Sequence, residues 1–379
     1  MTLDLFGNIN GVDESKYHPK FAFLKNELQT TNIKEMLINW TDGFVDRDGK
    51  FIQEFQKTFH SSFWEIYLYR LFTTAGYTLD QSHPMPDFII NTPYEIFVEA
   101  VIANIKLTGR KEQERTFDDQ LSMFTPPYLQ KDFYKLLDNA IIRYSNAISY
   151  KHKKLSKEYS KLEWVNLQKP FVLALASYDD VNYGREYIYP ILALLYGLYY
   201  NVDTNTYIPK EYIIKPESDA KIPIGLFNDE NYKNVSAIIF TCSLTLGKLT
   251  ALSISENKLS FNKVYSLHEN IITHKYVLKR VGIDDTETLS EGTFVFHNPN
   301  ASQKLPDDFL SKLNITNFYY QNNKLSFSGN PLPLISRINT NVLLSAYIEP
   351  ILYEDIRKYN MLSFKEFYDI IDSWFYIFQ

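Results

Sequence analysis

Cysteine is nearly absent from the 379-residue chain, which contains Cys242 alone. A single cysteine excludes an internal disulfide and a cysteine-rich zinc site. Cys242 stands in the apolar run VSAIIFTCSL, which is typical of a strand. We therefore expect it to be a buried structural thiol.

Long hydrophobic runs are also lacking. No segment approaches the roughly 18 to 20 uninterrupted apolar residues that a membrane helix needs. The first residues, MTLDLFGNINGVDESKY, show no basic stretch followed by an apolar one and a small-residue cleavage site. We therefore expect a soluble, cytoplasmic protein without membrane partners.

Basic residues are fewer than acidic ones. The chain has 39 lysines and arginines and 45 aspartates and glutamates, which gives a net charge of −6 at pH 7. A passive nucleic-acid binder is usually basic, so any contact with nucleic acid would have to use local patches. The sequence also lacks a glycine-rich phosphate loop, a Gly-x-Ser-x-Gly elbow, a Cys/His dyad and histidines at metal-ligand spacing. These absences leave few familiar catalytic chemistries.

Helix and strand patterns alternate in the first half of the chain. Apolar residues recur every four positions from Phe51 to about Thr74, which predicts one amphipathic helix. The runs DFII and EIFVEAVIA, joined by the turn-prone NTP, predict a pair of strands. A long helix is expected from about Lys131 to Ser160, followed by the buried strand KPFVLALAS and the helix EYIYPILALLYGLYY. This order predicts an α/β unit.

The second half is less regular. The runs VSAIIFTCS, KLTALSI and GTFVFHNPNA predict strands, and SENKLSFN predicts a tight hairpin. Ser363 and Glu366 have the spacing of a capping box and predict a C-terminal amphipathic helix. We expect an N-terminal helical extension over 1–50, an α/β core over 51–204 and a C-terminal α+β region over 205–379.

Two carboxylates stand at unusual positions in the stretch PMPDFIINTPYEIFVEAVIANIK. Asp87 opens one apolar run and Glu99 lies inside the next. Because charged side chains are rarely buried unless they are paired or bind a metal, both require a cation. Two strand carboxylates that converge on one point predict a Mg²⁺ site, which could activate a water and offset charge on a phosphodiester.

The order of these features resembles the PD-(D/E)xK nuclease superfamily, the restriction-endonuclease-like fold, from about Phe51 to Ser177. The resemblance implies that Asp87, Glu99 and the carbonyl of Ala100 bind Mg²⁺, with Mn²⁺ as a possible substitute. It also implies that Glu65, in SSFWEIYLYRLF, is the assisting helix acid.

The chain departs from that family at Val101, where the pattern has a lysine. Lys106 is seven residues from Glu99, and an odd step along a strand points to the opposite face. The following helix offers another source, because Arg143 and Lys151 lie on adjoining parts of one helical surface. Members of the superfamily with a lysine displaced onto this helix support Lys151 as the catalytic lysine, with Arg143 and Lys154 as nucleic-acid contacts.

The resemblance thus implies a Mg²⁺-dependent endonuclease that cuts DNA in restriction or phage defence. Its C-terminal region would recognise the target, a partner protein or a second copy in a homodimer. Two alternatives stay open, a catalytically silent nuclease-like binding module and an RNA nuclease. Each of the three main residues also has an interpretation without a catalytic role. Asp87 could belong to an ordinary Pro-Asp turn, Glu99 to a half-exposed strand and Lys151 to a solvated helix face.

Overall fold

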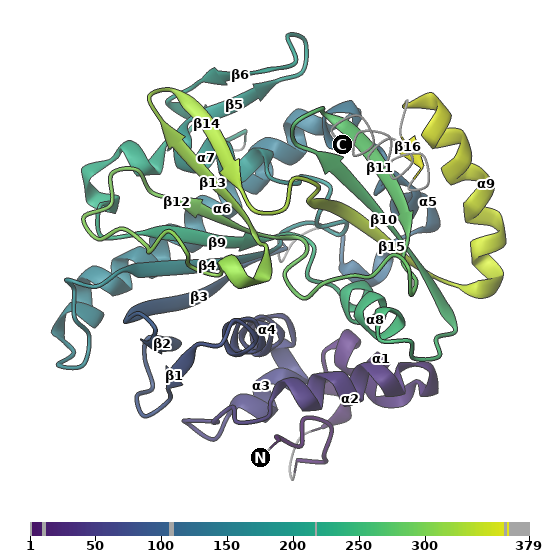
Figure 1. The fold of residues 1–379 in the computed structure, drawn as a ribbon, viewed down its shortest axis with the longest axis horizontal. Helices are drawn as coiled ribbons and strands as arrows, with labels where there is room; N and C mark the ends of the chain where they lie inside the picture. The colour runs from purple at the N-terminus through teal and green to yellow at the C-terminus, as the bar shows by residue number, and fades with distance from the viewer. Residues whose placement is uncertain (1, 10–12, 106–109, 217, 360–361, 364–379) are drawn as a thin grey trace, which may run out of the picture.

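The computed structural model describes residues 2–9, 13–105, 110–216, 218–359 and 362–363. Its centre is a mixed eight-stranded sheet with helices on both faces, so the chain has an α/β fold (Figure 1). Within the described residues, no helix has both the length and the apolar character needed to cross a membrane.

The large sheet is antiparallel at both edges and partly parallel in the middle. In spatial order its strands are β1 (Thr78–Asp80), β2 (Phe88–Thr92), β3 (Ile96–Asn104), β4 (Phe171–Tyr178), β9 (Ala237–Thr241), β12 (Thr293–His297), β13 (Thr316–Gln321) and β14 (Lys324–Ser328). Strands β1 to β3 run antiparallel, whereas β3, β4 and β9 are parallel neighbours. Strand β12 is antiparallel to β9 and parallel to β13, and β14 is antiparallel to β13.

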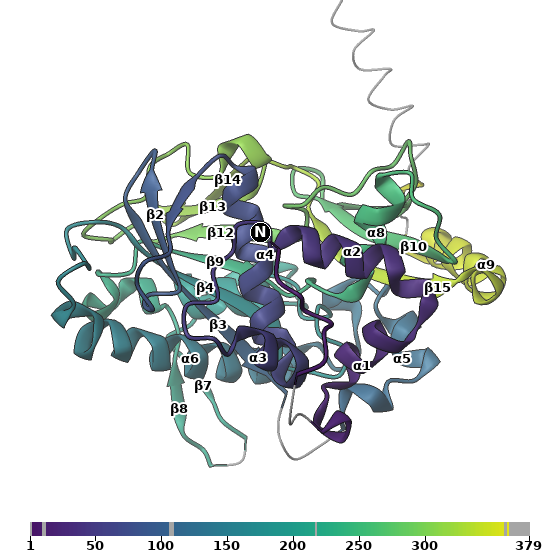
Figure 2. The same cartoon turned by 90° about the horizontal axis from the view of Figure 1, so that it is seen from below.

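Helices cover the two faces of this sheet as separate layers (Figures 1 and 2). The helices are α1 (Pro19–Asn26), α2 (Thr31–Trp40), α3 (Phe51–Thr58), α4 (His60–Thr74), α5 (Phe117–Ser122), α6 (Phe133–Lys157), α7 (Tyr189–Tyr196), α8 (Leu246–Ser255) and α9 (Val342–Lys358). Helix α4 packs on one face of the sheet and α6 and α7 on the other. Strand β4 shows why, since Val172 and Ala174 belong to the core under α4, while Leu173 and Leu175 belong to the core under α6 and α7.

A second, smaller sheet lies beside the large one. Its strands, in order, are β15 (Leu334–Asn341), β10 (Asn262–Asn270), β11 (Lys275–Arg280) and β16 (Leu362–Ser363). Two hairpins complete the strands, β5 (Leu198–Asn201) with β6 (Thr206–Pro209) and β7 (Tyr212–Ile214) with β8 (Lys221–Pro223). Because β9 and β12 to β14 follow residue 205, the large sheet takes strands from both sides of the expected boundary between core and C-terminal region.

Most of the elements expected in the first half are confirmed, but one helix is divided, and the helix expected over EYIYPILALLYGLYY ends at Tyr196, so that its last residues form β5. The helix predicted from Phe51 to Thr74 is α3 followed by α4, because Phe59 leaves helical geometry with φ 10° and ψ −58°. The fully buried Phe59 ring lies 5.2 Å from that of Phe55 and 5.4 Å from that of Phe63. Aromatic packing therefore accompanies a break that sequence periodicity does not reveal.

Two expectations in the second half are wrong. KLTALSI forms part of helix α8 instead of a strand, and SENKLSFN connects α8 to β10 instead of forming a hairpin. Helix α8 buries Leu249, Ala251 and other residues on several sides, and a short apolar run of this kind has no periodicity that separates helix from strand. The expected C-terminal helix, from Phe364 onward, lies outside the described residues.

A buried ion cluster joins α8 to the small sheet. Lys248 Nζ lies 2.6 Å from Glu287 Oε1, and Arg337 Nε donates to Glu287 Oε2 at 3.0 Å. Burial lowers the pKa of Lys248 to about 8. Burial alone would raise the pKa of Glu287, but Arg337 and Lys248 bring it below its usual range. Glu287 is thus the shared partner of two buried cations.

This sharing predicts unequal mutational costs. Glu287→Gln leaves two buried cations without a carboxylate and should lower the free energy of unfolding by about 3–5 kcal/mol. Lys248→Met should cost less, because Glu287 keeps Arg337. Urea unfolding followed by circular dichroism measures both, with Glu230→Gln in the exposed Lys233–Glu230 pair as control. Equal costs for the two buried substitutions would contradict the shared-partner interpretation.

Candidate active site

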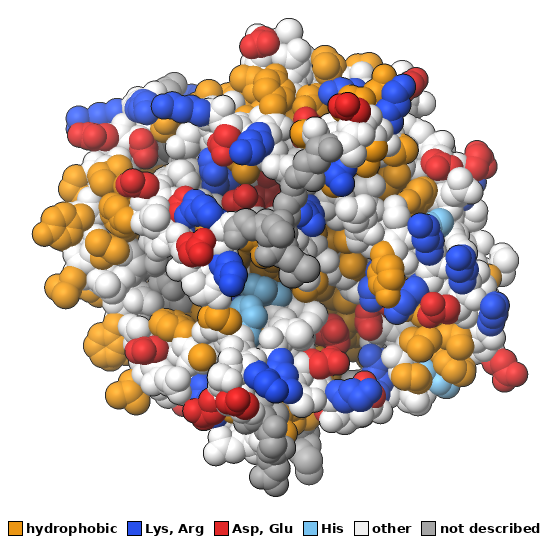
Figure 3. Space-filling model, turned by 180° about the vertical axis from the view of Figure 1, so that it is seen from behind, with side chains coloured by type: hydrophobic (Ala, Val, Ile, Leu, Met, Phe, Trp, Pro, Cys, Tyr) orange, Lys and Arg blue, Asp and Glu red, His pale blue; other side chains and the backbone are white. Residues whose placement is uncertain are grey.

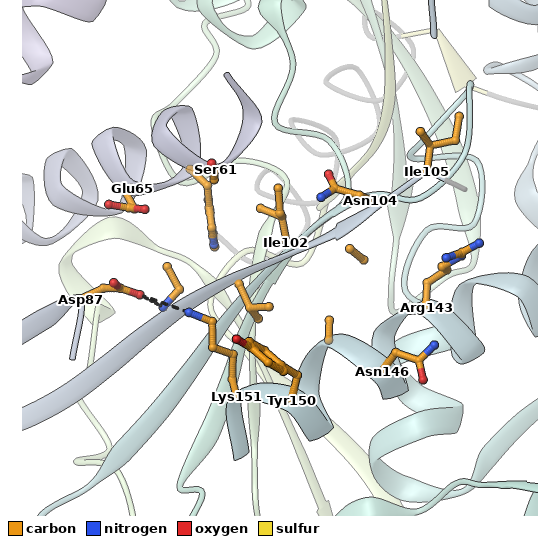
Figure 4. Close-up of a pocket in the computed structure, with 15 residues that line it drawn as sticks. Ser61, Glu65, Asp87, Ile102, Asn104, Ile105, Arg143, Asn146, Tyr150 and Lys151 are labelled. Carbon is orange, nitrogen blue, oxygen red and sulfur yellow. Dashed lines mark hydrogen bonds and ion pairs between the residues drawn. The ribbon is translucent and has the colours of Figure 1, made fainter. Parts of the chain in front are cut away.

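A pocket of about 620 Å³ lies along the edge of β3, between α4 and α6 (Figure 4). It exists because β2 pairs with β3 only as far as Phe88 and Val98, whereas β3 continues to Asn104 along β4. Residues 100–104 therefore present an edge without a strand partner in the described part of the chain. All five of these residues line the pocket.

Asp87 and Glu99 lie where the two strands separate. Asp87 directly precedes Phe88 and Glu99 directly follows Val98, so both lie next to the last registered pair of these antiparallel strands. The Ala100 N–H donates to Asp87 Oδ2 at 2.7 Å, and the Asp87 N–H donates to Glu99 Oε2 at 3.3 Å. Each carboxylate is therefore held by the backbone of the opposite strand.

Lys151 reaches this pair from α6. Its Nζ donates to Glu99 Oε1 at 2.5 Å and lies 4.0 Å from Asp87 Oδ2. The Glu99 side chain is 2% exposed and that of Lys151 is 17% exposed. Val101, at the position where a family member would carry its lysine, is buried in the core under α6. The cation that Glu99 requires thus comes from a residue 52 positions later in the sequence.

Glu65 approaches from the other side of β3. It lies on α4 and lines the same pocket, and Figure 4 shows it opposite the helix that carries Lys151. Burial first, and then the charge of Asp87, raise the pKa of Glu65 well above its usual value. Its carboxylate is therefore a third acidic group in a space that contains one ammonium.

Three carboxylates, those of Glu65, Asp87 and Glu99, lie close together around Lys151. Burial and the charge of Glu99 raise the pKa of Asp87 to about 7, although Lys151 and the Ala100 N–H counteract them. Burial would lower the pKa of Lys151, but Asp87 and Glu99 together raise it above its usual value. The site would be stabilised by additional positive charge.

The loop before Asp87 is held from outside the sheet. Arg47 Nη2 donates to the Asp87 carbonyl at 2.9 Å, and its Nη1 donates to the His83 carbonyl at 2.7 Å. Trp164 Nε1 donates to the Met85 carbonyl at 2.8 Å, and its ring stacks on that of His83 at 4.3 Å. Sequence reasoning missed Arg47 and Trp164, since both act on backbone atoms and neither belongs to a recognisable pattern.

The rest of the pocket wall on α6 is polar and aromatic. Arg143, Asn146 and Tyr150 follow one another along the helix toward Lys151 (Figure 4). The Tyr150 side chain is 60% exposed, and Lys154 Nζ lies 5.6 Å from the centre of its ring. Lys154 therefore borders the pocket through Tyr150 without lining it.

The structure thus brings most of the predicted site residues to one place. Glu65, Asp87, Ala100, Arg143 and Lys151 all line the pocket, and the buried carboxylate of Glu99 lies behind it on Lys151. Lys106, the alternative lysine, is outside the described residues. On the face shown in Figure 3, basic and acidic side chains are intermixed.

The oxygen donors at the site suit a hard cation, although no group of three or more histidine, cysteine, aspartate or glutamate side chains in the described residues forms a ready metal cluster. Asp87 supplies carboxylate oxygen at the pocket wall. A cation bound here would compete with Lys151 for Glu99.

Comparison of the chain with protein-family models, with curated proteins and with solved structures finds no match.

The raised pKa of Asp87 predicts a pH effect on stability in metal-free buffer. A free aspartate titrates near pH 3.9, so between about pH 4 and pH 7 the folded state binds more protons than the unfolded state. The titration of Asp87 should therefore contribute a fall in the free energy of unfolding as the pH rises through this window. In Asp87→Asn this fall should become shallower, as measured by urea unfolding in EDTA at several pH values. An unchanged slope would show that Asp87 does not titrate in this range.

Proposed function

We propose that this chain is a Mg²⁺-dependent nuclease that hydrolyses phosphodiester bonds of DNA in the pocket beside β3. The observation that carries the proposal is the meeting of Asp87, Glu99 and Lys151, with Lys151 Nζ 2.5 Å from Glu99 and 4.0 Å from Asp87. These residues come from the start of β2, from β3 and from α6, and Glu65 of α4 shares the pocket. A purely local structural role does not require such convergence.

The order and direction of the surrounding elements also support the proposal. Helix α4 precedes the antiparallel strands β1 to β3, and α6 then returns the chain to β4, parallel to β3. This order is similar to the one on which the resemblance to the restriction-endonuclease-like core rests. Cleavage of foreign DNA in restriction or phage defence is the biological role that the resemblance implies.

Each residue then has a role that its position permits. Asp87, Glu99 and the Ala100 carbonyl hold the metal, and Glu65 supports it from α4. When bound, Mg²⁺ acidifies a water and offsets negative charge on the phosphate. Lys151 orients the attacking water or the phosphate.

Two basic residues on α6 extend the proposal to the nucleic acid. Arg143 lines the same pocket, and Lys154 borders it beside the exposed ring of Tyr150. Both are placed to contact backbone phosphates.

A specific observation favours the rival function, a catalytically silent binding module. The contact between Lys151 and Glu99 already gives the most buried carboxylate a cation, so this pair can be structural. In addition, β3 carries Val101 at the position where the nuclease family has its lysine. Metal dependence separates the two functions.

Activity is the first test. The purified protein is incubated with supercoiled plasmid, single-stranded DNA and RNA in Mg²⁺, Mn²⁺ or EDTA. We expect metal-dependent cutting of DNA that falls at least about 100-fold in Asp87→Asn and Lys151→Met, because these substitutions remove a metal ligand and the positioning cation. Lys153→Met, an exposed lysine on the same helix, should retain wild-type activity.

The outcomes of this assay are distinct. Cutting of RNA alone would reassign the substrate and keep the chemistry. Cutting that survives in Asp87→Asn would refute the assigned site, and no cutting of any substrate would favour the silent module.

Metal binding is tested without activity. Mg²⁺ or Mn²⁺ at millimolar concentration should raise the midpoint of thermal unfolding of the wild type, because a ligand of the folded state stabilises it by mass action. Asp87→Asn should lose most of this increase, whereas Lys153→Met should keep it. An equal increase in the wild type and in Asp87→Asn would mean that the ion binds elsewhere.

A further inference from the structure

A second cavity, of about 290 Å³, lies away from the β3 pocket and shares no lining residue with it. It is formed where the start of α7, the β5–β6 hairpin and the β10–β11 hairpin meet, elements that Figure 1 shows in the upper part of the molecule. A water molecule occupies about 30 Å³ of liquid, so the cavity has room for about ten groups of that size.

Tyrosine rings dominate the wall of this cavity. The six that line it are Tyr128, Tyr187, Tyr189, Tyr200, Tyr207 and Tyr276. The ring centres of Tyr189 and Tyr200 are 4.7 Å apart, and those of Tyr200 and Tyr207 are 5.2 Å apart with a 71° angle between the planes. Ring faces carry the negative end of the aromatic quadrupole, so a wall rich in tyrosine rings offers surfaces that attract a cation.

One carboxylate accompanies the rings. The Glu269 side chain lines the cavity and is 13% exposed. Its ion-pair partner among the described residues is His274, at 3.4 Å, and that side chain is 78% exposed. No lysine or arginine is among the described residues that line the cavity, so His274, on the exposed side of Glu269, is the basic group at its wall.

Two further features mark the wall as a binding surface. The Tyr187 hydroxyl is buried and has no hydrogen-bond partner among the described residues, which is uncommon for a buried polar group. Tyr187 also has a φ of 51°, an uncommon conformation for an aromatic residue. After burial, the charge of Glu269 is the largest influence that raises the pKa of Tyr187, Tyr189 and Tyr207, which places this carboxylate electrostatically among the rings.

We propose that this cavity binds a small organic cation, with tyrosine faces around an ammonium group and Glu269 as its counter-charge. Aromatic rings attract ammonium groups most strongly where water is excluded, and a buried carboxylate adds a charge that a neutral ligand cannot use. A phosphate or carboxylate ligand would be repelled by Glu269, and the basic group at the wall, His274, is already paired with that carboxylate. The proposal is independent of the nuclease proposal, since the two pockets have no residue in common.

Isothermal titration calorimetry with choline and with butylammonium tests the proposal. We expect saturable binding of at least one of them below about 10 mM. The neutral carbon isostere of choline, with a tert-butyl group in place of trimethylammonium, should bind at least about tenfold more weakly. Choline binding alone would indicate a quaternary ammonium ligand, and butylammonium binding alone would indicate a protonated amine.

Variants then identify the residues. Glu269→Gln should weaken binding of the cation about tenfold or more, whereas Glu354→Gln, an exposed glutamate on α9, should leave it unchanged. Equal binding of choline and its neutral isostere by the wild type would overturn the proposal even if a variant failed to fold. The proposal would also be overturned if neither choline nor butylammonium bound, or if folded Glu269→Gln bound the cation as well as the wild type.

Discussion

The candidate active site depends on one constraint, which is that the Glu99 carboxylate is buried inside the sheet and requires a cation. Removing one partner of a buried ion pair typically costs about 3–5 kcal/mol, because the remaining charge stays without compensation. Helix α6 must therefore place Lys151 over β3, and its packing achieves this, since Tyr144 and Ile148 on the same helix are fully or almost fully buried against the sheet. The helix is fixed by its apolar contacts and by its charge together.

The open edge of β3 is the second determinant. An unpaired strand edge exposes backbone N–H and C=O groups, which proteins usually cover. Here β2 stops pairing at Phe88, and the loop before it is turned aside and held by Arg47 and Trp164. The edge that results faces a pocket walled by α4 and α6. Backbone oxygens of the β3 edge and side-chain oxygens from α4 and from the start of the β2 segment thus lie in one pocket. No single helix or strand could place both kinds of oxygen there.

Local sequence patterns were sufficient to predict which residues form a large part of the candidate site. The carboxylates at Asp87 and Glu99 stood out because their neighbours are apolar, and helical spacing pointed to Lys151 as a source of positive charge. The structure brings these three side chains together. Their chemical role still rests on the resemblance to a nuclease family.

What the sequence could not provide is mostly long-range or backbone-directed. Arg47 and Trp164 bind carbonyl groups 36 to 79 residues away, and such contacts leave no local signature. The recruitment of β9 and β12 to β14 into the large sheet is equally non-local. The wrong assignment at α8 has another cause, because a short helix buried on several sides lacks the one-sided pattern on which assignment depends.

The crowding of buried carboxylates around Lys151 distinguishes the two interpretations of this lysine. If its contact with Glu99 were purely structural, one ammonium and one carboxylate would suffice, and the pair would be balanced. Instead Asp87 and Glu65 share the pocket, and burial raises the pKa of both. Repulsion adds to this, from Glu99 at Asp87 and from Asp87 at Glu65. A buried carboxylate without a counter-charge raises the free energy of the folded state. In the metal-free protein the carboxyl groups of this cluster are therefore either partly protonated or charged without sufficient positive charge nearby. A divalent cation would remove this penalty, and on this physical ground the metal-dependent function is favoured over the silent module.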